Sequence, residues 1–253
     1  MSSSFGECSV CHLISLSDDA DNSATIAQWN NTEKSVTLTG RTLYRGGSWN
    51  TLCLPFTIDN LTSTPLKDAK VKTLSSTLFA DATLTMNFSE DQTSTEAGKP
   101  YIVKWDDEDH LDNITNPVFE GVTIDEKMNK VETDYVDFVG SYNPVDIPGE
   151  DRTMLFLGAN NTLYYPNDIM TINSFRAYFL LKGIVAGDPI AGVRAFTMNF
   201  GDENTTGMEK TQSSMSNTQH HEAWYDLRGR KLHGKPTTKG VYINNGSKVM
   251  IKY

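Results

Sequence analysis

The sequence predicts an all-β fold, with an antiparallel β-sandwich or jelly-roll-like body followed by a small three-strand β module. Three observations predict it. Apolar and polar residues alternate with a period of two in many short segments, as they do in half-buried strands. Gly, Pro, Asn or Asp bounds each segment and supplies turn conformations. No window of about 12 residues has the i, i+3, i+4, i+7 apolar spacing of an amphipathic helix, so we expect one or two short helical turns at most.

The clearest strand pattern lies at residues 35–44, where Val36 and Leu38 alternate with threonines. Gly46-Gly47 predicts a hairpin turn between this strand and the next, and Asn160-Asn161 predicts another after 154–157. In chain order, the strands expected in the body are 35–44, 49–56, 71–74, 83–88, 101–105, 118–124, 135–139, 154–157, 162–165, 175–181 and 194–200.

The domain organisation follows from the distribution of apolar residues. Residues 1–33 form a poorly defined N-terminal segment, 34–200 form the sandwich, and 201–222 form a polar linker without Ile, Leu, Val, Phe, Tyr or Trp. Residues 223–253 hold three short strand patterns, with Gly229-Arg230 and Asn245-Gly246 as turns. Because so few strands bury little surface, we expect this module to lean on the main body or on a partner.

The net charge is −10, and it is unevenly distributed. Residues 223–253 carry seven Lys and Arg against one acid, a net +6, so the rest carries −16. This balance disfavours nucleic acid as a partner. Apolar runs fall far short of the roughly 20 residues that span a bilayer, so we predict no transmembrane segment. The first basic residue is Lys34, so no secretory signal peptide is evident, and the chain is expected to be cytosolic or the tail of a longer protein.

The three cysteines predict no disulfide framework. Cys53 lies in an apolar run and is expected to be a buried thiol. Cys8, Cys11 and His12 form the C-x-x-C-H pattern that can attach a c-type haem, but their flanks are polar, whereas a haem needs an apolar pocket. A labile disulfide, an adventitious metal ion or an incidental pattern are the other interpretations, and we predict no cofactor.

The basic C-terminal segment carries spaced motifs. Tyr225-Asp226 precedes Gly229-Arg230, a G-x-Y motif follows at 240–242, and a basic, β-branched strand closes the chain. This pattern resembles the C-terminal sorting domain of Bacteroidetes proteins exported by type IX (Por) secretion, although family domains usually run longer. The resemblance implies a secreted or cell-surface address, within a longer precursor, and recognition by export machinery. The sorting-motif candidates are Tyr225, Asp226, Gly229, Arg230, Gly240, Tyr242, Lys248 and Lys252.

Within this tail we expect two classes of residue. Arg228, Arg230, Lys248 and Lys252 are expected to face the export machinery. The residues expected to pack inward are Trp224, Leu227, Val241, Ile243, Val249 and Ile251. The alternative is that the tail is a further hairpin-rich part of a single domain.

The body also carries a resemblance. Residues 38–55, 97–105, 116–124, 155–166 and 175–178 are similar to a module of large surface-associated proteins in Bacteroides and Prevotella relatives. The resemblance implies export and surface exposure, and it implies no mechanism.

Catalytic signatures are absent from the sequence, which has no G-x-S-x-G, H-E-x-x-H, P-loop or G-x-G-x-x-G motif. Of five histidines, His110 alone is placed to reach a groove, and it lies within an acidic run. That run is interpreted as a solvated loop, a calcium site or, last, a source of catalytic carboxylates; its acids are Asp106, Asp107, Glu108, Asp109 and Asp112. The same alternatives apply to Asp18, Asp19 and Asp21. We predict no catalytic and no metal-ligating residue.

Aromatic residues suggest the remaining kind of site. Trp49, Trp105, Tyr164 and Tyr165, with Tyr178, form either a sugar-stacking platform or part of the core. Adjacent Tyr164 and Tyr165 must point to opposite faces of a strand, so one is expected to be the more exposed.

Three hypotheses for function follow. The first is a non-enzymatic adhesion or scaffold module of an exported protein, with a sorting tail. The second is a carbohydrate-binding module, and the third is an accessory domain of a secreted hydrolase. A glycan or a host surface protein is the partner expected beyond the export machinery.

Overall fold

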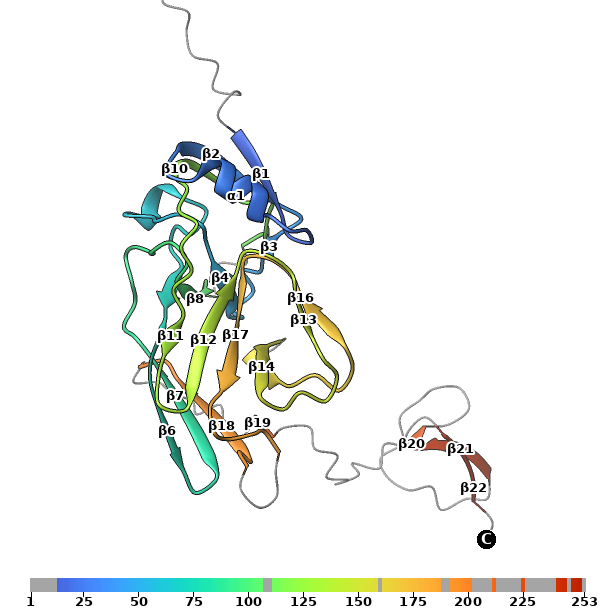
Figure 1. The fold of residues 1–253 in the computed structure, drawn as a ribbon. Helices are drawn as coiled ribbons and strands as arrows, with labels where there is room; N and C mark the ends of the chain where they lie inside the picture. The colour runs from blue at the N-terminus through green and yellow to red at the C-terminus, as the bar shows by residue number, and fades with distance from the viewer. Residues whose placement is uncertain are drawn as a thin grey trace, which may run out of the picture. The chain divides into compact units, whose positions relative to one another are not determined.

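Strands make up most of the regular structure, so the chain is all-β as predicted (Figure 1). The structure is a computed structural model that describes residues 13–106, 111–158, 161–187 and 192–201, together with the strand backbone at 211–212, 224–225, 240–244 and 247–251. The chain divides into two compact units, Met1–Ser213 and Ser214–Tyr253. Within the described part there is one α-helix, α1 (Ser23–Trp29), which buries only Ile26.

The first sheet has the order β1-β2-β10, with β1 (Leu13–Ser17), β2 (Glu33–Thr39) and β10 (Val118–Thr123). In β2 every second residue is buried, which confirms the alternation expected of its segment. β1 and α1 lie in a segment whose structure the sequence leaves undefined. They are hard to recognise because each buries a single residue, Leu16 in β1 and Ile26 in α1.

The second sheet separates the two apolar cores of the larger unit. Its order is β4-β8-β5, with β4 (Asn50–Cys53), β8 (Pro100–Lys104) and β5 (Lys70–Lys72). Tyr101 and Val103 of β8 pack in the first core with Phe56 and Phe119, whereas Ile102 packs in the second. Successive residues of a strand point to opposite faces, so β8 contributes to both cores and is buried along most of its length.

The third sheet has the order β11-β12-β17-β14-β15 and carries much of the second core. Phe138 and Phe179 stack there with ring centroids 4.6 Å apart, and full burial of one such side chain stabilises the fold by about 1.5–3 kcal/mol. Its strands are β11 (Val131–Glu132), β12 (Val136–Ser141), β17 (Arg176–Leu181), β14 (Met154–Leu157) and β15 (Leu163–Tyr164). The short strands β13 (Val145–Ile147) and β16 (Met170–Ile172) pair with each other beside it.

The fourth sheet, in the order β19-β18-β7-β6, completes this unit. Its strands are β6 (Leu74–Ala80), β7 (Thr83–Phe88), β18 (Ala195–Asn199) and β19 (Thr211–Gln212). β7 and β18 are parallel, as are β1 and β2, and these two pairs depart from the predicted antiparallel arrangement. Parallel neighbours need long connections, so no local turn signal reveals them.

One of the two predicted hairpins in the body forms. β14 and β15 pair through Leu157 and Leu163, and the Gly158 N–H donates to the Thr162 carbonyl at 2.8 Å. The prediction of a hairpin at Gly46-Gly47 was wrong, because the two strands that flank this turn do not pair with each other. β3 (Thr42–Leu43) pairs with β9 (Ile114–Thr115), whereas β4 pairs with β8.

The smaller unit holds the three-strand sheet that the sequence predicts. Its order is β20-β21-β22, with β20 (Trp224–Tyr225), β21 (Gly240–Asn244) and β22 (Ser247–Ile251), all antiparallel. Asn244 pairs with Ser247, and the predicted turn residues between them lie outside the described residues. No helix among the described residues is long and apolar enough to cross a membrane.

Candidate ligand-binding groove

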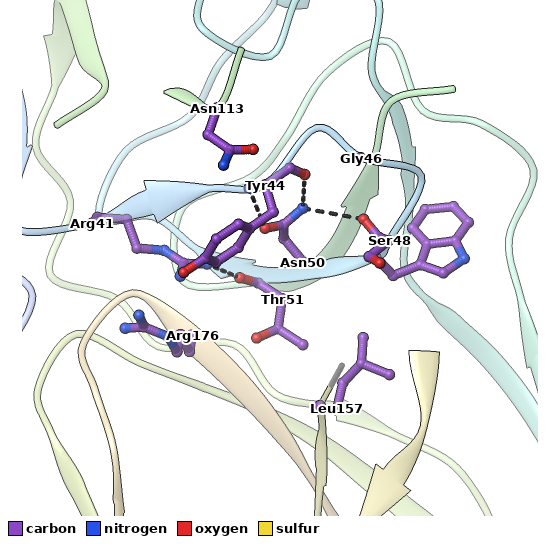
Figure 2. A pocket seen from close by; sticks show the side chains of 11 residues that line it. Arg41, Tyr44, Gly46, Ser48, Asn50, Thr51, Asn113, Leu157 and Arg176 are labelled. Atoms are coloured by element: carbon purple, nitrogen blue, oxygen red, sulfur yellow. Dashed lines mark hydrogen bonds between the residues drawn. The ribbon is translucent and has the colours of Figure 1, made fainter. Parts of the chain in front are cut away.

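A hollow of about 610 Å³ opens between the chain after β2, the loop before β4 and the end of β14 (Figure 2). A second hollow, of about 330 Å³, lies beside β16 and shares Thr51, Leu157, Gly158 and Arg176 with the first. We call the two together the arginine groove. The larger hollow is lined by Arg41, Tyr44, Gly46, Ser48, Trp49, Asn50, Thr51, Asn113, Leu157, Gly158 and Arg176.

Arg41 reaches the groove because a glycine breaks the predicted strand 35–44. Gly40 has φ of +86°, so β2 ends at Thr39 and β3 begins at Thr42, with Arg41 at the break. A left-handed backbone of this kind favours glycine. A Cβ at Gly40 would also lie 3.3 Å from the Cβ of Asp18, so the small residue lets Asp18 approach the break.

The loop between β3 and β4 is closed by the side chain of Asn50. Its Oδ1 accepts the Tyr44 N–H and its Nδ2 donates to the Tyr44 carbonyl, both at 2.8 Å. The amide thus takes the place of a paired strand residue, which explains how the loop holds its shape without a hairpin. Tyr44 is left 57% exposed beside the groove.

The guanidinium of Arg41 is buried and has no acidic partner. Arg41 is 3% exposed, its Nη2 donates to the Thr51 carbonyl at 2.7 Å, and its buried Nε has no hydrogen-bond partner. None of the ion pairs among the described residues includes Arg41. Burial, and then the charge of Arg176, lower the pKa of Arg41, while Asp18 opposes the shift. Arginine nevertheless stays charged at neutral pH.

Arg176, from β17, is held by Asp18. Its two terminal nitrogens contact the two carboxylate oxygens of Asp18, with Nη2 and Oδ2 at 3.1 Å, in the paired geometry that suits a guanidinium and a carboxylate. Asn173 Nδ2 donates to the same carboxylate at 2.9 Å. Asp18 is buried, so the structure corrects its interpretation as a solvated acid or a calcium ligand.

The predicted aromatic residues do not form one platform. Trp105 is 1% exposed in the first core, and its Nε1 donates to the Lys67 carbonyl. Trp49 packs in the second core, where it stacks on Phe200 with centroids 4.8 Å apart, and it lines the groove although it is only 7% exposed. Both tryptophans therefore fit the core interpretation.

Tyr164 and Tyr165 behave as their alternation predicts. Tyr164 is 38% exposed and stacks on Phe156, whereas Tyr165 packs against the second core. Tyr178 is half-buried, and burial raises its pKa. Neither Tyr164 nor Tyr165 lines the groove, so the exposed ring there is that of Tyr44, which is not among the aromatic residues predicted for the site.

The other predicted site residues have separate placements. Asp106 pairs with Lys70 at 3.3 Å, Asp21 accepts the Ser23 N–H, and Asp19 accepts the Ser17 hydroxyl. Hydrogen bonds from Ser23 lower the pKa of Asp21. No group of three or more His, Cys, Asp or Glu suited to a metal ion occurs in the described part of the chain. The predictions for Cys8, Cys11, His12, Asp107, Glu108, Asp109 and His110 fall outside the described residues.

Cys53 is buried as predicted. Its Sγ lies 3.4 Å from the Gly98 carbonyl oxygen, and burial raises the pKa of the thiol. A Cβ at Gly140 would lie 2.3 Å from this Sγ, so the sulfur fills space that the glycine leaves. Cys53 is therefore a packing residue.

The sorting-motif candidates divide into two groups. Tyr225, Gly240, Tyr242 and Lys248 lie on β20, β21 and β22, and the register pairs Lys248 with Ile243. Lys248 was expected to face the export machinery, and Ile243 was expected to pack inward. The register instead pairs these two residues directly across β21 and β22. Asp226, Gly229, Arg230 and Lys252 lie outside the described residues.

Comparisons of the chain with known proteins return no relative. No family model, no curated protein and no solved structure matches it. No relative's ligand or activity therefore bears on the arginine groove.

Proposed function

We propose that the chain is a non-enzymatic adhesion module of an exported, cell-surface or secreted protein, and that it binds carbohydrate in the arginine groove. The observation that carries the proposal is the character of the groove wall. It combines an exposed aromatic ring with amide, hydroxyl and guanidinium groups, and it contains no Asp, Glu, His or Cys among its described residues. Acid–base or nucleophilic catalysis would call on such groups.

The groove has the features of a saccharide site. The ring of Tyr44 offers an apolar face, and Asn50, Asn113 and Ser48 offer polar groups that suit sugar hydroxyls. Its volume lies in the range of small-ligand sites, about 300–1,000 Å³. The second hollow extends the groove along β16, which allows more than one sugar unit.

Binding of the full chain to an array of glycans tests this proposal. Tyr44→Ala should weaken binding about tenfold, since stacking and ring burial contribute roughly 1–2 kcal/mol. Leu78→Ala is the control, because Leu78 of β6 is an apolar side chain as exposed as Tyr44, at 58%, and does not line the groove. Loss of binding in Leu78→Ala alone would move the site to β6. Binding to a host surface protein but to no glycan, or cleavage of a bound glycan, would overturn the proposal.

We also propose that the smaller unit is a sorting signal. Its three antiparallel strands and the net charge of +6 on residues 223–253 support a separate, basic element that export machinery recognises. Removal of residues 223–253 from the exported parent protein should abolish its appearance at the cell surface or in the medium. A variant with the same 31 residues in scrambled order keeps the charge, and it should fail equally. Unchanged export of either variant would contradict the assignment.

A further inference from the structure

We propose that the arginine groove selects saccharides that carry an acidic group, either a carboxylate or a sulfate ester, and that Arg41 and Arg176 bind this group. The inference rests on the proposed carbohydrate-binding function and names the class of sugar. It follows from four features of the groove, namely its charge balance, the fixed orientation of both guanidinium groups, the partnerless Nε of Arg41 and the size of the hollow.

The charges at this end of the groove do not cancel. Arg41 and Arg176 supply two positive charges and Asp18 supplies one negative charge, and no other charged residue among the described ones lines the larger hollow. A buried charge without a partner is costly, so proteins usually pair it or place it where a ligand pairs it. One anionic group would balance the set.

Both guanidinium groups are held in place before any ligand arrives. The Thr51 carbonyl fixes Arg41, and Asp18 together with the Ser174 carbonyl fixes Arg176. Figure 2 shows Arg41 and Arg176 at the same end of the groove, with the Tyr44 ring beside Arg41. Pre-oriented donors lose little freedom on binding, and planar guanidinium groups match the geometry of carboxylate and sulfate oxygens.

The Nε atom of Arg41, which has no hydrogen-bond partner, is a further sign of a ligand. This atom is buried, belongs to a residue only 3% exposed and has no acceptor within the described part of the chain. A buried donor without an acceptor costs about 1–3 kcal/mol. Burial of the Arg41 guanidinium is costly because the group is charged. An oxyanion bound beside it would offset that charge and so reduce the cost.

A saccharide suits the groove better than other anions. A free inorganic ion would leave most of the 610 Å³ unfilled. Nucleic acid would bring a run of phosphates, whereas Arg41 and Arg176 are the only basic residues among the described ones that line the larger hollow. An acidic sugar supplies the anion for the two arginines, a ring face for Tyr44 and hydroxyls for Asn50 and Asn113.

Calorimetric titration of the full chain tests the inference with three matched sugars, galacturonate, galactose 6-sulfate and galactose. At least one acidic sugar should bind about tenfold more tightly than galactose. Raising the salt concentration should narrow the difference. Binding of galacturonate alone, or of galactose 6-sulfate alone, identifies which acidic group the site takes. Equal affinity for all three sugars would overturn the inference while leaving the carbohydrate proposal standing, and no binding to any glycan on the array would overturn both.

Two variants locate the preference. Arg41→Gln should abolish it, whereas Arg194→Gln, which removes the same charge from an exposed residue outside the groove, should retain it. If Arg41→Gln does not fold, Arg41→Lys serves instead, since it keeps the charge but loses the planar fork, and it should lower acidic-sugar affinity at least threefold. In the unmodified chain the acidic sugar should raise the melting temperature and galactose should not. A preference retained in the Arg41 variant would contradict the assignment.

Discussion

Two regions of the larger unit each bury a carboxylate against two cations, and they differ in their charge balance. In the arginine groove Asp18 forms an ion pair with Arg176 alone, and the nearby Arg41 is left as a surplus positive charge. At the edge of the third sheet Asp137 contacts Lys130 at 2.8 Å and Lys182 at 2.9 Å, and Glu132 contacts Lys130 in turn. Two acids there meet two bases, so the set is neutral.

The difference separates a structural ion network from the proposed binding site. Glu132 and Asp137 are directly paired across β11 and β12, so Lys130 bridges two acids that would otherwise repel each other. Asp137 Oδ1, like Arg41 Nε, has no hydrogen-bond partner, but Lys182 Nζ lies 2.9 Å from it, so the charges already balance without a ligand. In the groove the same number of cations has a single acid, and the second guanidinium lies in a hollow that is open to a ligand. Surplus buried charge, rather than buried charge itself, therefore marks the candidate site.

The largest effect is expected at Asp18. Asp18→Ala removes the one acid of the groove set and leaves two arginines facing each other, so the free energy of unfolding should fall by about 3 kcal/mol, the scale for breaking a buried ion pair. Urea denaturation of the variant and the unmodified chain measures it. A loss below about 1 kcal/mol would mean that solvent already screens both guanidinium groups. The contrast between a surplus buried charge in the groove and a balanced set at Asp137 would then not hold.

A smaller, pH-dependent effect is expected at Asp137. Burial raises the pKa of Asp137, but the hydrogen bond from Lys130 and the ion pair with Lys182 outweigh it, so the net pKa lies below its ordinary value. A carboxyl with a lowered folded-state pKa stabilises the fold above its unfolded pKa, near 3.9, and this stabilisation is lost as the pH falls through the folded-state pKa. Asp137→Asn should therefore cost about 1–2 kcal/mol at pH 7, since its lysine partners are half-exposed.

Unfolding measured between pH 7 and pH 3 tests that sign. The gap between Asp137→Asn and the unmodified chain should narrow as the pH falls. Glu132→Gln is the control, because Glu132 is exposed and meets Lys130 alone, so its cost should be smaller at every pH. A gap that stays constant would assign the role of Asp137 to packing.

Individual strands also show what a sequence can predict. The bounds of β7 and β14 agree with the segments 83–88 and 154–157, and in β7 this is because one face is buried and the other partly exposed, which writes a clear alternation. β6 was missed because it is an edge strand with only Leu74 buried, whereas β8, although both of its faces are covered, was predicted from the short apolar run 101–105. A strand can therefore be predicted from alternation or from a short apolar run, and it is missed where almost none of its residues is buried.

The groove was beyond the sequence for a different reason. Asp18 and Arg176 are 158 positions apart, and the closure of the loop by Asn50 depends on side-chain contacts that no local pattern records. Arg41 was predicted to lie within the strand 35–44, because a single glycine in an alternating segment, here Gly40, does not predict that the strand ends. The sequence did predict Trp49 as a site residue, and it lines the groove. The reason given was an aromatic sugar-stacking platform, which the structure does not contain.

The smallest stability effect, and the sharpest contrast, is expected at Arg41. Arg41→Gln gives up the hydrogen bond to the Thr51 carbonyl but also removes the surplus charge and the partnerless Nε, so its free energy of unfolding should stay within about 1 kcal/mol of the unmodified chain. Lys182→Gln, which takes a cation from the balanced set, should cost more despite its greater exposure, because it leaves Asp137 with one partner. Urea denaturation of both variants decides the order. Binding residues are often held at some expense of stability, so an Arg41 variant that keeps its stability while losing acidic sugar would show that the second arginine serves the ligand and not the fold.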